Sequence, residues 1–172
     1  SVNLSAQPLK TFKYTYVTYA DYKTAATKVA KKISPSITPS NLKLVVRAAL
    51  AVAIIEQGRD GKIRGFNNNL TGVESSGFKV FTSSDVNGKV LAKEGGTERM
   101  KEYYSFLSIE AGLVPLISKI IGRNMFAQDG TANQFAWRYY RDWNGYGARS
   151  KTTFKNDCKT ITGIENTYNS TS

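Results

Sequence analysis

The segment Leu42–Ile55, LKLVVRAALAVAII, followed directly by Glu56, decides how this chain folds. Its apolar residues cover almost every side of a helix, and helices of that kind lie in the interior of a protein. We therefore predict a central buried helix over about residues 41–57. Ser40 is the expected N-cap of this helix, and Gly58 is the expected C′ residue after its end.

Glu56 is the most informative single residue because it stands at the end of this apolar helix. A carboxylate there is costly to keep ionised, since burial and the negative end of the helix dipole both disfavour its charge. A carboxylic acid that holds its proton near neutral pH is what a general acid needs. Glu56 is therefore the candidate catalytic acid, against the alternative of a helix-terminal side chain that points to solvent.

Composition and charge limit the possible partners. The 172 residues are expected to form one domain, 1–172, and they carry 24 Lys and Arg against 13 Asp and Glu, a net charge of +11. Such a charge favours an anionic partner such as nucleic acid, an acidic membrane face or a bacterial cell wall. The charge is spread along the chain and forms no basic arm, which argues against nucleic acid as a specific partner. No apolar run reaches the length of a membrane span, so membrane insertion is not expected.

The chain contains no histidine and one cysteine, Cys158. Without histidine, Ser-His-Asp and Cys-His catalysis and the usual zinc sites are excluded, and we expect neither metal nor other cofactor. Cys158 has no partner in the sequence for a disulfide and is interpreted as a buried structural thiol. An enzyme of this composition must work with Asp, Glu, Tyr, Lys or Arg, which narrows the field to chemistry that carboxylates perform alone.

Helical periodicity and capping residues predict further helices on both sides of a glycine-rich region. Their expected bounds are Tyr19–Lys32, Thr97–Tyr104, Ser108–Ile121, Ala132–Trp143 and Thr152–Thr162. Pro115 is expected to kink the helix in which it lies. Residues 1–18 are expected to form an extended lead-in, and residues 164–172 a flexible tail.

The stretch from Arg59 to Gly96 has the composition of a small β-lobe, because glycine and turn residues recur in it. Phe78–Phe81 and Val90–Leu91 are strand candidates, and Asn87–Gly88 between them is the expected hairpin turn. The predicted fold class is α+β, mainly α. A helical lobe around the central helix and a glycine-rich β-hairpin lobe would form a cleft between them.

Two motifs around Glu56 resemble a known enzyme family. Ala49–Gly58, ALAVAIIEQG, is similar to the Ala-Leu-Glu-Ser-Gly helix end of bacterial endo-β-N-acetylglucosaminidases. Asn68–Val73, NNLTGV, is similar to their Asn-Asn-Leu-Phe-Gly-Ile turn, and the 13 residues from Glu56 to Asn69 are close to the family's spacing.

Three further stretches resemble the family in the same order along the chain. Thr82–Lys89 is similar to its hairpin with an acid before Asn-Gly, Tyr103–Phe106 to its Tyr-x-Ser segment, and Gly145–Ala148 to its Gly-Tyr-Ala motif. The resemblance covers about residues 20–165 and implies a lysozyme-like fold that cleaves peptidoglycan after N-acetylglucosamine. It also implies a monomer without cofactor whose partner is the glycan strand. The expected location is outside the cell or in the cell envelope, or the virion if the chain is phage-derived.

The resemblance implies catalytic roles for three residues. Glu56 would protonate the glycosidic oxygen, and Asp85 would serve as base for water or as stabiliser of the oxocarbenium-like transition state. Glu74 and Glu94 are fallback candidates for the second carboxylate. Tyr146 would line the site near Glu56. The structural alternatives are a turn-initiating aspartate and a loop tyrosine packed on the last helix.

Five residues are expected to bind the substrate, namely Asn68, Asn69, Phe66, Tyr103 and Trp143. The asparagines would contact sugar amides, although asparagine also suits a turn for purely structural reasons. The aromatic side chains would offer apolar faces to pyranose rings, although aromatic residues at helical spacing belong more often to the core.

The sequence departs from the family pattern at several positions, and this keeps other functions open. Gln57 replaces a common Ser, Arg59 replaces a Trp, Thr71 replaces a Phe, and Asp85 is offset by one residue from the family's acid. A lytic transglycosylase on the same fold would need one carboxylate and form an anhydro sugar. A non-catalytic module that binds wall glycan or serves in a virion would need none. Binding of nucleic acid by charge alone would show steep salt dependence.

Overall fold

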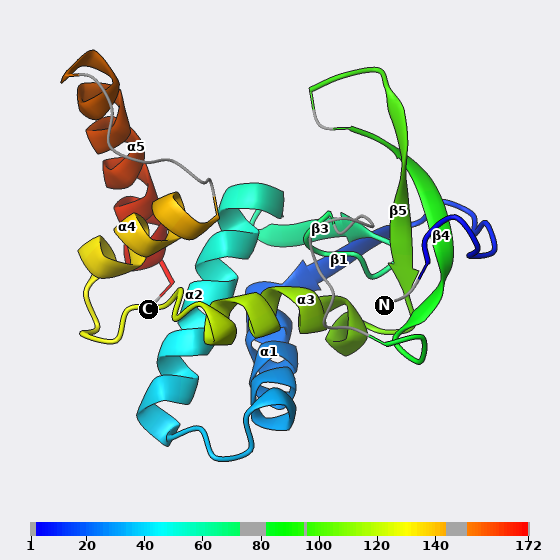
Figure 1. The fold of residues 1–172 in the computed structure, drawn as a ribbon, viewed down its shortest axis with the longest axis horizontal. Helices are drawn as coiled ribbons and strands as arrows, with labels where there is room; N and C mark the ends of the chain where they lie inside the picture. Colours follow the sequence, from blue (N-terminus) through cyan, green and yellow to red (C-terminus); the bar gives the residue numbers. More distant parts are fainter. Residues whose placement is uncertain (1–2, 73–81, 95, 144–150, 172) are drawn as a thin grey trace.

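The computed structural model describes residues 3–72, 82–94, 96–143 and 151–171, with side chains in the last range from 158 onward. Within these ranges the protein has a mostly helical α+β fold with five helices and two small antiparallel sheets (Figure 1). The helices are α1 Tyr19–Ile33, α2 Pro39–Gln57, α3 Ile109–Gly122, α4 Ala132–Asp142 and α5 Lys151–Asn169. The strands are β1 Tyr14–Thr18, β2 Gly58–Arg59, β3 Lys62–Phe66, β4 Val86–Lys93 and β5 Met100–Phe106. None of the helices in these ranges combines the length and the apolar character that crossing a bilayer requires.

Helix α2 forms the centre of the molecule, as its apolar sequence predicts. Its middle, residues 48–53, is fully buried, and the helix contacts α1, α3, α5 and β3. The predicted N-cap was wrong by two residues, because the Thr38 hydroxyl accepts from the Asn41 amide 3.2 Å away. Pro39 then occupies the first helical position, where its missing N–H costs nothing. The predicted bounds of α1, α3 and α4 agree with the structure to within about two residues.

Gly58 ends α2 for a different reason from the one predicted. Its backbone is extended, with φ −67° and ψ 131°, and it leads directly into β2. A Cβ at this position would lie 2.4 Å from the Ile54 carbonyl oxygen. Glycine is therefore required here by a close approach of the backbone to α2, and not by a left-handed turn.

The first sheet has the order β1-β3-β2 and joins the N-terminal segment to the residues that follow α2. Tyr14 pairs with Phe66 and Thr18 with Lys62 along an antiparallel register. Strand β3 was not predicted, and the end of the expected lead-in, residues 14–18, is a strand of this sheet. The N-terminal segment thus belongs to the folded domain.

The second sheet is the hairpin of β4 and β5, and it corrects two predictions. Asn87–Gly88 lies inside β4 and not in the hairpin turn. A Cβ on Gly88 would lie 2.5 Å from the Pro8 carbonyl oxygen, so glycine is needed here because the N-terminal segment packs against the strand. The predicted helix over 97–104 is instead β5, whose Tyr103 and Phe106 are buried as strand side chains. The hairpin turn lies between the two strands, where the Glu94 amide donates to the Arg99 carbonyl. The strand predicted at 78–81 lies outside the described residues.

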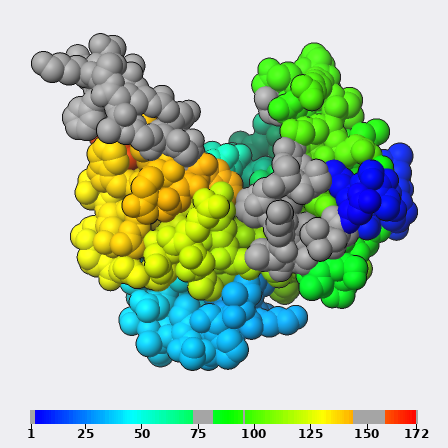
Figure 2. Space-filling model, viewed as in Figure 1, coloured from blue at the N-terminus to red at the C-terminus, as the bar shows by residue number. Residues whose placement is uncertain are grey.

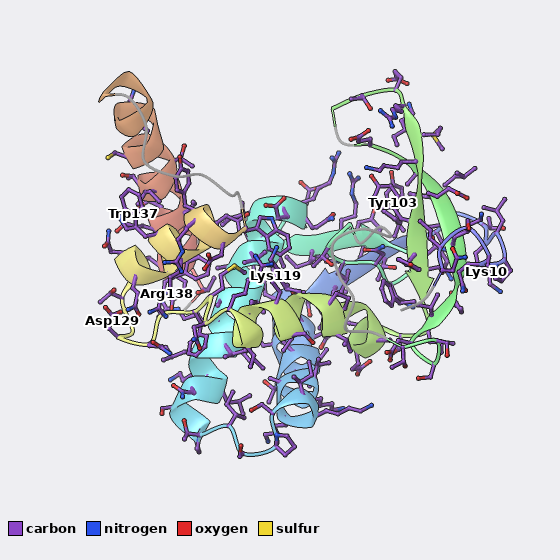
Figure 3. All side chains as sticks on the ribbon, viewed as in Figure 1. Lys10, Tyr103, Lys119, Asp129, Trp137 and Arg138 are labelled. Atoms are coloured by element: carbon purple, nitrogen blue, oxygen red, sulfur yellow. The ribbon has the colours of Figure 1, made fainter. Side chains whose placement is uncertain are left out.

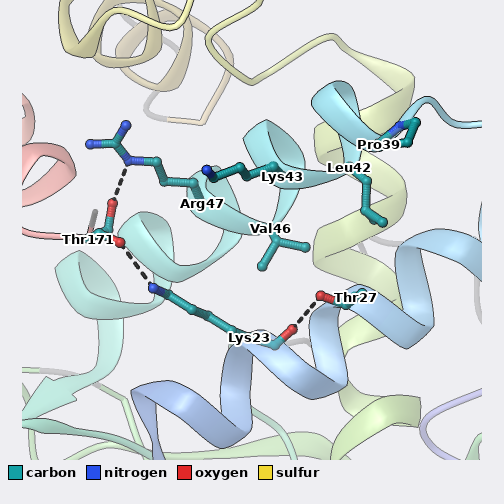
Figure 4. A pocket seen from close by; sticks show the side chains of 8 residues that line it. All are labelled: Lys23, Thr27, Pro39, Leu42, Lys43, Val46, Arg47 and Thr171. Carbon is teal, nitrogen blue, oxygen red and sulfur yellow. Dashed lines mark hydrogen bonds between the residues drawn. The ribbon is translucent and has the colours of Figure 1, made fainter.

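The C-terminal segment is packed against the domain, and the prediction of a flexible tail after Gly163 was wrong. Helix α5 continues to Asn169, and Tyr168 and Thr171 are buried. Arg47 of α2 donates to the Tyr168 carbonyl at 3.1 Å. It also donates to the Thr171 hydroxyl at 3.0 Å, and Lys23 of α1 donates to the Thr171 carbonyl at 3.1 Å (Figure 4). Two cations therefore hold the carbonyl end of α5, where the helix dipole favours positive charge. Cys158, expected to be buried, is half-buried on this helix.

Candidate active site

A cavity of about 540 Å³ opens where the end of α2 meets β3 and the β4–β5 hairpin. Figure 2 shows the surface hollowed between the green hairpin and the orange end of α4. The residues that line the cavity are Phe12, Tyr14, Glu56, Gln57, Arg64, Gly65, Phe66, Gly72, Leu91, Ala92, Lys93, Met100 and Tyr103. Aromatic and aliphatic side chains with a few polar groups are typical of a ligand site. Three predicted site residues, Glu56, Phe66 and Tyr103, meet here.

Glu56 lies near the end of α2 and is exposed to the cavity. The buried hydroxyl of Tyr139 on α4 donates a hydrogen bond to its Oε1 atom. The sequence argument that burial surrounds this carboxylate was therefore wrong, because the apolar part of α2 ends one residue earlier. What the fold supplies to Glu56 is a fixed hydrogen-bond donor on one oxygen and access to solvent.

Tyr139 is held in position by stacked aromatic rings along α4. Trp143 stacks on it at 6.1 Å between ring centroids and 13° between planes, and Phe135 stacks at 5.9 Å and 21°. Burial raises the pKa of the Tyr139 phenol, and its hydrogen bond to Glu56 and the charge of Glu56 raise it further. The phenol therefore remains a neutral donor at every physiological pH.

Trp143, predicted to bind substrate, is half-buried and does not line the cavity that Glu56 lines. The Lys119 ammonium lies 4.3 Å from the centre of the Trp143 ring. Figure 3 labels Lys119, which belongs to α3. Partial burial of the Lys119 ammonium lowers its pKa, and the positive charge of the neighbouring Arg123 lowers this pKa further. Trp143 thus acts on the site through Tyr139, which it stacks against, and not by direct contact with the cavity.

Four aromatic side chains form the wall of the cavity opposite Glu56. Phe66 lies edge-on to Tyr103 at 5.2 Å and stacks on Phe12 at 5.6 Å, and Phe12 meets Tyr14 at 4.9 Å. Phe12 and Tyr14 are 39% and 49% exposed, so part of each ring is accessible to a ligand. These two residues were not predicted as site residues, although aromatic side chains alternating at 12, 14 and 16 indicate one face of a strand.

Asn68 and Asn69 serve the fold at the end of β3 and do not line this cavity. Asn69 is fully buried and donates to the Tyr104 carbonyl at 2.8 Å, and Asn68 donates to the Phe106 carbonyl at 3.0 Å. Asn68 has φ 58°, in the left-handed region that asparagine tolerates. A Cβ on Gly112 of α3 would lie 1.8 Å from the Asn68 carbonyl oxygen, so this turn packs directly on the helix.

Asp85 lies before β4 and is not among the residues that line the cavity. Its carboxylate accepts from the Thr82 amide at 2.9 Å and the Thr82 hydroxyl at 3.2 Å, which is the geometry of a turn-forming aspartate. Glu94, in the hairpin turn, lies 3.8 Å from Arg99. Tyr146 and Glu74 fall outside the described residues. Among the residues that the structure describes, Glu56 is thus the one carboxylate on the cavity wall.

A cavity of about 560 Å³ beside the N-terminal segment is lined by the predicted site residue Asn68, together with Lys10, Lys13, Asn87 and Ser105. No three Asp, Glu or Cys side chains in these ranges gather as metal ligands would. Another cavity of about 510 Å³ lies between α1 and α2 (Figure 4). Two of its cations, Lys23 and Arg47, already bind the carbonyl end of α5, which gives them a structural role.

Comparison with protein-family models, curated proteins and solved structures gave no match to this chain.

Proposed function

We propose that this protein cleaves β-1,4 glycan linkages in peptidoglycan on a lysozyme-like fold, as a hydrolase of the endo-β-N-acetylglucosaminidase type. The observation that carries the proposal is the carboxylate of Glu56, which the Tyr139 hydroxyl fixes at the edge of an aromatic-walled cavity. The motif resemblance around Glu56 supports the same assignment. The net charge of +11 favours adsorption to an anionic wall.

Glu56 acts as the general acid in this proposal. In its protonated form it donates a proton to the glycosidic oxygen as the bond from that oxygen to the anomeric carbon breaks. The proton leaves with the departing sugar as a hydroxyl group. Water then adds to the oxocarbenium-like carbon and gives one proton to the Glu56 carboxylate, which restores the acid. The Tyr139 hydroxyl stabilises the carboxylate that proton transfer leaves behind, because a hydrogen bond to the charged form favours that form.

The strand side of the cavity binds the sugars. The exposed parts of Phe12 and Tyr14, together with Phe66 and Tyr103, offer apolar surface to pyranose rings. Arg64 lies 4.8 Å from the Tyr14 ring, and it supplies positive charge for the carboxylates that peptidoglycan carries. The cavity therefore suits a glycan strand with acidic substituents.

A lytic transglycosylase is the second candidate, and a specific observation favours it. Glu56 is the one carboxylate lining the cavity among the described residues, while Asp85 is engaged in its own turn. A transglycosylase needs one carboxylate, because a hydroxyl of the sugar itself takes the place of water and forms an anhydro ring. A hydrolase of the usual kind needs a second carboxylate.

The masses of the products separate these reactions. Purified peptidoglycan is incubated with wild type, Glu56→Gln and the control Glu165→Gln, which alters a half-buried glutamate on α5 away from the cavity. We expect Glu56→Gln to lower the rate about 10²–10⁴-fold and Glu165→Gln to leave it unchanged. Reducing N-acetylglucosamine ends in the wild-type products support the hydrolase, and anhydro ends support the transglycosylase. A protein that binds the wall without releasing any fragment would be a non-catalytic module.

A further inference from the structure

A row of three exposed aromatic side chains leads out of the cavity along the N-terminal strand. Phe12, Tyr14 and Tyr16 are 39%, 49% and 55% exposed. Their ring centroids are 4.9 Å apart for the first pair and 5.9 Å for the second. Residues two apart on an extended chain point to the same side, so the three rings form one continuous row.

This row begins inside the cavity and ends outside it. Phe12 and Tyr14 line the cavity, whereas Tyr16 does not. On the opposite side of the strand, Val17 is buried in the main core, so the inward positions already stabilise the fold. The outward rings contribute little to that core, and adjoining exposed apolar side chains of this size usually mark an interaction site.

Basic residues accompany the row on the neighbouring strand. Tyr16 pairs with Arg64 and Thr18 with Lys62 in the register of β1 and β3. Arg64 also lies over the Tyr14 ring at 4.8 Å. The sheet face thus presents aromatic rings on one strand and positive charges on the next, which suits a polymer of sugar rings that carries carboxylates.

We infer that Phe12, Tyr14 and Tyr16 form an extended binding platform for a β-1,4-linked amino-sugar strand, with Tyr16 as its outer contact beyond the cavity. The inference rests on the proposed function of the cavity. The spacing of the rings is on the scale of one pyranose unit. Neighbouring rings are turned by 86° and 45°, so they can meet successive sugars of a twisted strand, whereas they form no flat surface.

The test measures binding of glycan oligomers of increasing length to the full chain carrying Glu56→Gln, which prevents cleavage. Adding Tyr16→Ala should weaken binding of long peptidoglycan oligomers about three- to tenfold. Short oligomers that fill only the cavity should bind as before. Tyr16→Phe, which keeps the ring, and Trp137→Ala, which removes an exposed ring on α4, should both bind long oligomers normally.

Three results would overturn the inference. In the first, Tyr16→Ala leaves the binding of long oligomers unchanged. In the second, it weakens the binding of short and long oligomers equally, which indicates a general disturbance of β1. Either result would leave the proposed function intact, because the short oligomers still report on the cavity. A wild-type protein that binds no glycan of any length, yet binds single-stranded oligonucleotides through Tyr16, would refute both the platform and the proposed function.

Discussion

The two walls of the Glu56 cavity are built in different ways. On the helical wall, Glu56 is fixed by Tyr139, whose ring is buried between Phe135 and Trp143. On the strand wall, aromatic rings such as Tyr14 are half-exposed and contact mainly one another. A buried, hydrogen-bonded group is held in one geometry, whereas an exposed ring offers contact area to ligands in many orientations. The helical wall is therefore suited to chemistry and the strand wall to binding.

This contrast predicts that substitutions on the two walls change different kinetic constants. Loss of an interaction made only in the transition state lowers kcat, and loss of one made equally in the ground state raises KM.

Among substitutions that leave Glu56 in place, the largest effect is expected from Tyr139→Phe, which removes the hydroxyl that donates to Glu56 and keeps the stacked ring. A hydrogen bond to a charged group contributes about 1.5–3 kcal/mol, so kcat should fall about 10- to 100-fold while KM stays unchanged. Steady-state kinetics on soluble glycan oligomers measure both constants. Tyr140→Phe on the same helix is the control. An unchanged kcat would remove Tyr139 from the mechanism.

The packing of α3 on the turn after β3 is tested by Gly112→Ala. The added Cβ would lie 1.8 Å from the Asn68 carbonyl oxygen, so α3 and the turn after β3 must move apart. We expect the free energy of unfolding to fall by about 1–3 kcal/mol, measured by urea denaturation. Gly122→Ala, at the end of the same helix, meets no atom within 4 Å and should not destabilise the protein. Equal stability of the two variants would contradict this packing.

On the strand wall, Phe66→Ala should raise KM about three- to tenfold and leave kcat within a factor of about two. Phe66 contacts Phe12 and Tyr103 but makes no contact with the proposed acid that the structure records. Kinetics on the same oligomers, with Trp137→Ala as the control, would check the division of roles. A fall in kcat with constant KM would contradict the assignment of the strand wall to binding and the helical wall to chemistry.

The smallest effect is a pH dependence of stability that comes from Tyr139 on the helical wall. The pKa of Tyr139 is raised in the folded state, so its contribution to stability is complete below pH 10 and is lost as pH rises beyond it. The reason is that the unfolded chain releases this proton while the folded chain retains it. Between pH 9 and pH 10.5 the free energy of unfolding of the wild type should fall by about 0.8 kcal/mol more than that of Tyr139→Phe. Urea denaturation at pH 9 and 10.5 measures this, and Tyr16→Phe should follow the wild type.

The sequence was sufficient to predict the parts of the fold that local patterns determine. The apolar run after Leu42 identified α2, and Ser108 marked the start of α3. The hairpin was misplaced because Asn87–Gly88 has the composition of a turn, whereas the need for Gly88 comes from Pro8, which is distant in sequence. Strand β5 was mistaken for a helix because its pairing with β4 was not visible locally.

The candidate site was predictable only in part, for the same reason. Glu56 stood out by its position at the end of an apolar helix, Tyr103 by its motif, and Phe66 as an aromatic residue that could face a sugar ring. Tyr139 was missed because 83 residues separate it from Glu56 and its role depends on how α4 packs. The expected desolvation of Glu56 failed because the apolar surface of a helix does not determine which way its last side chain points.

The most direct test of the account combines binding and cleavage in one incubation. Wild type and Glu56→Gln are mixed with insoluble peptidoglycan, and the bound protein and the released glycan fragments are measured together. We predict that both proteins bind equally, because the strand wall is unchanged, and that release falls about 10²–10⁴-fold in the variant. Release at the wild-type rate by Glu56→Gln would contradict the assignment of Glu56 as the general acid.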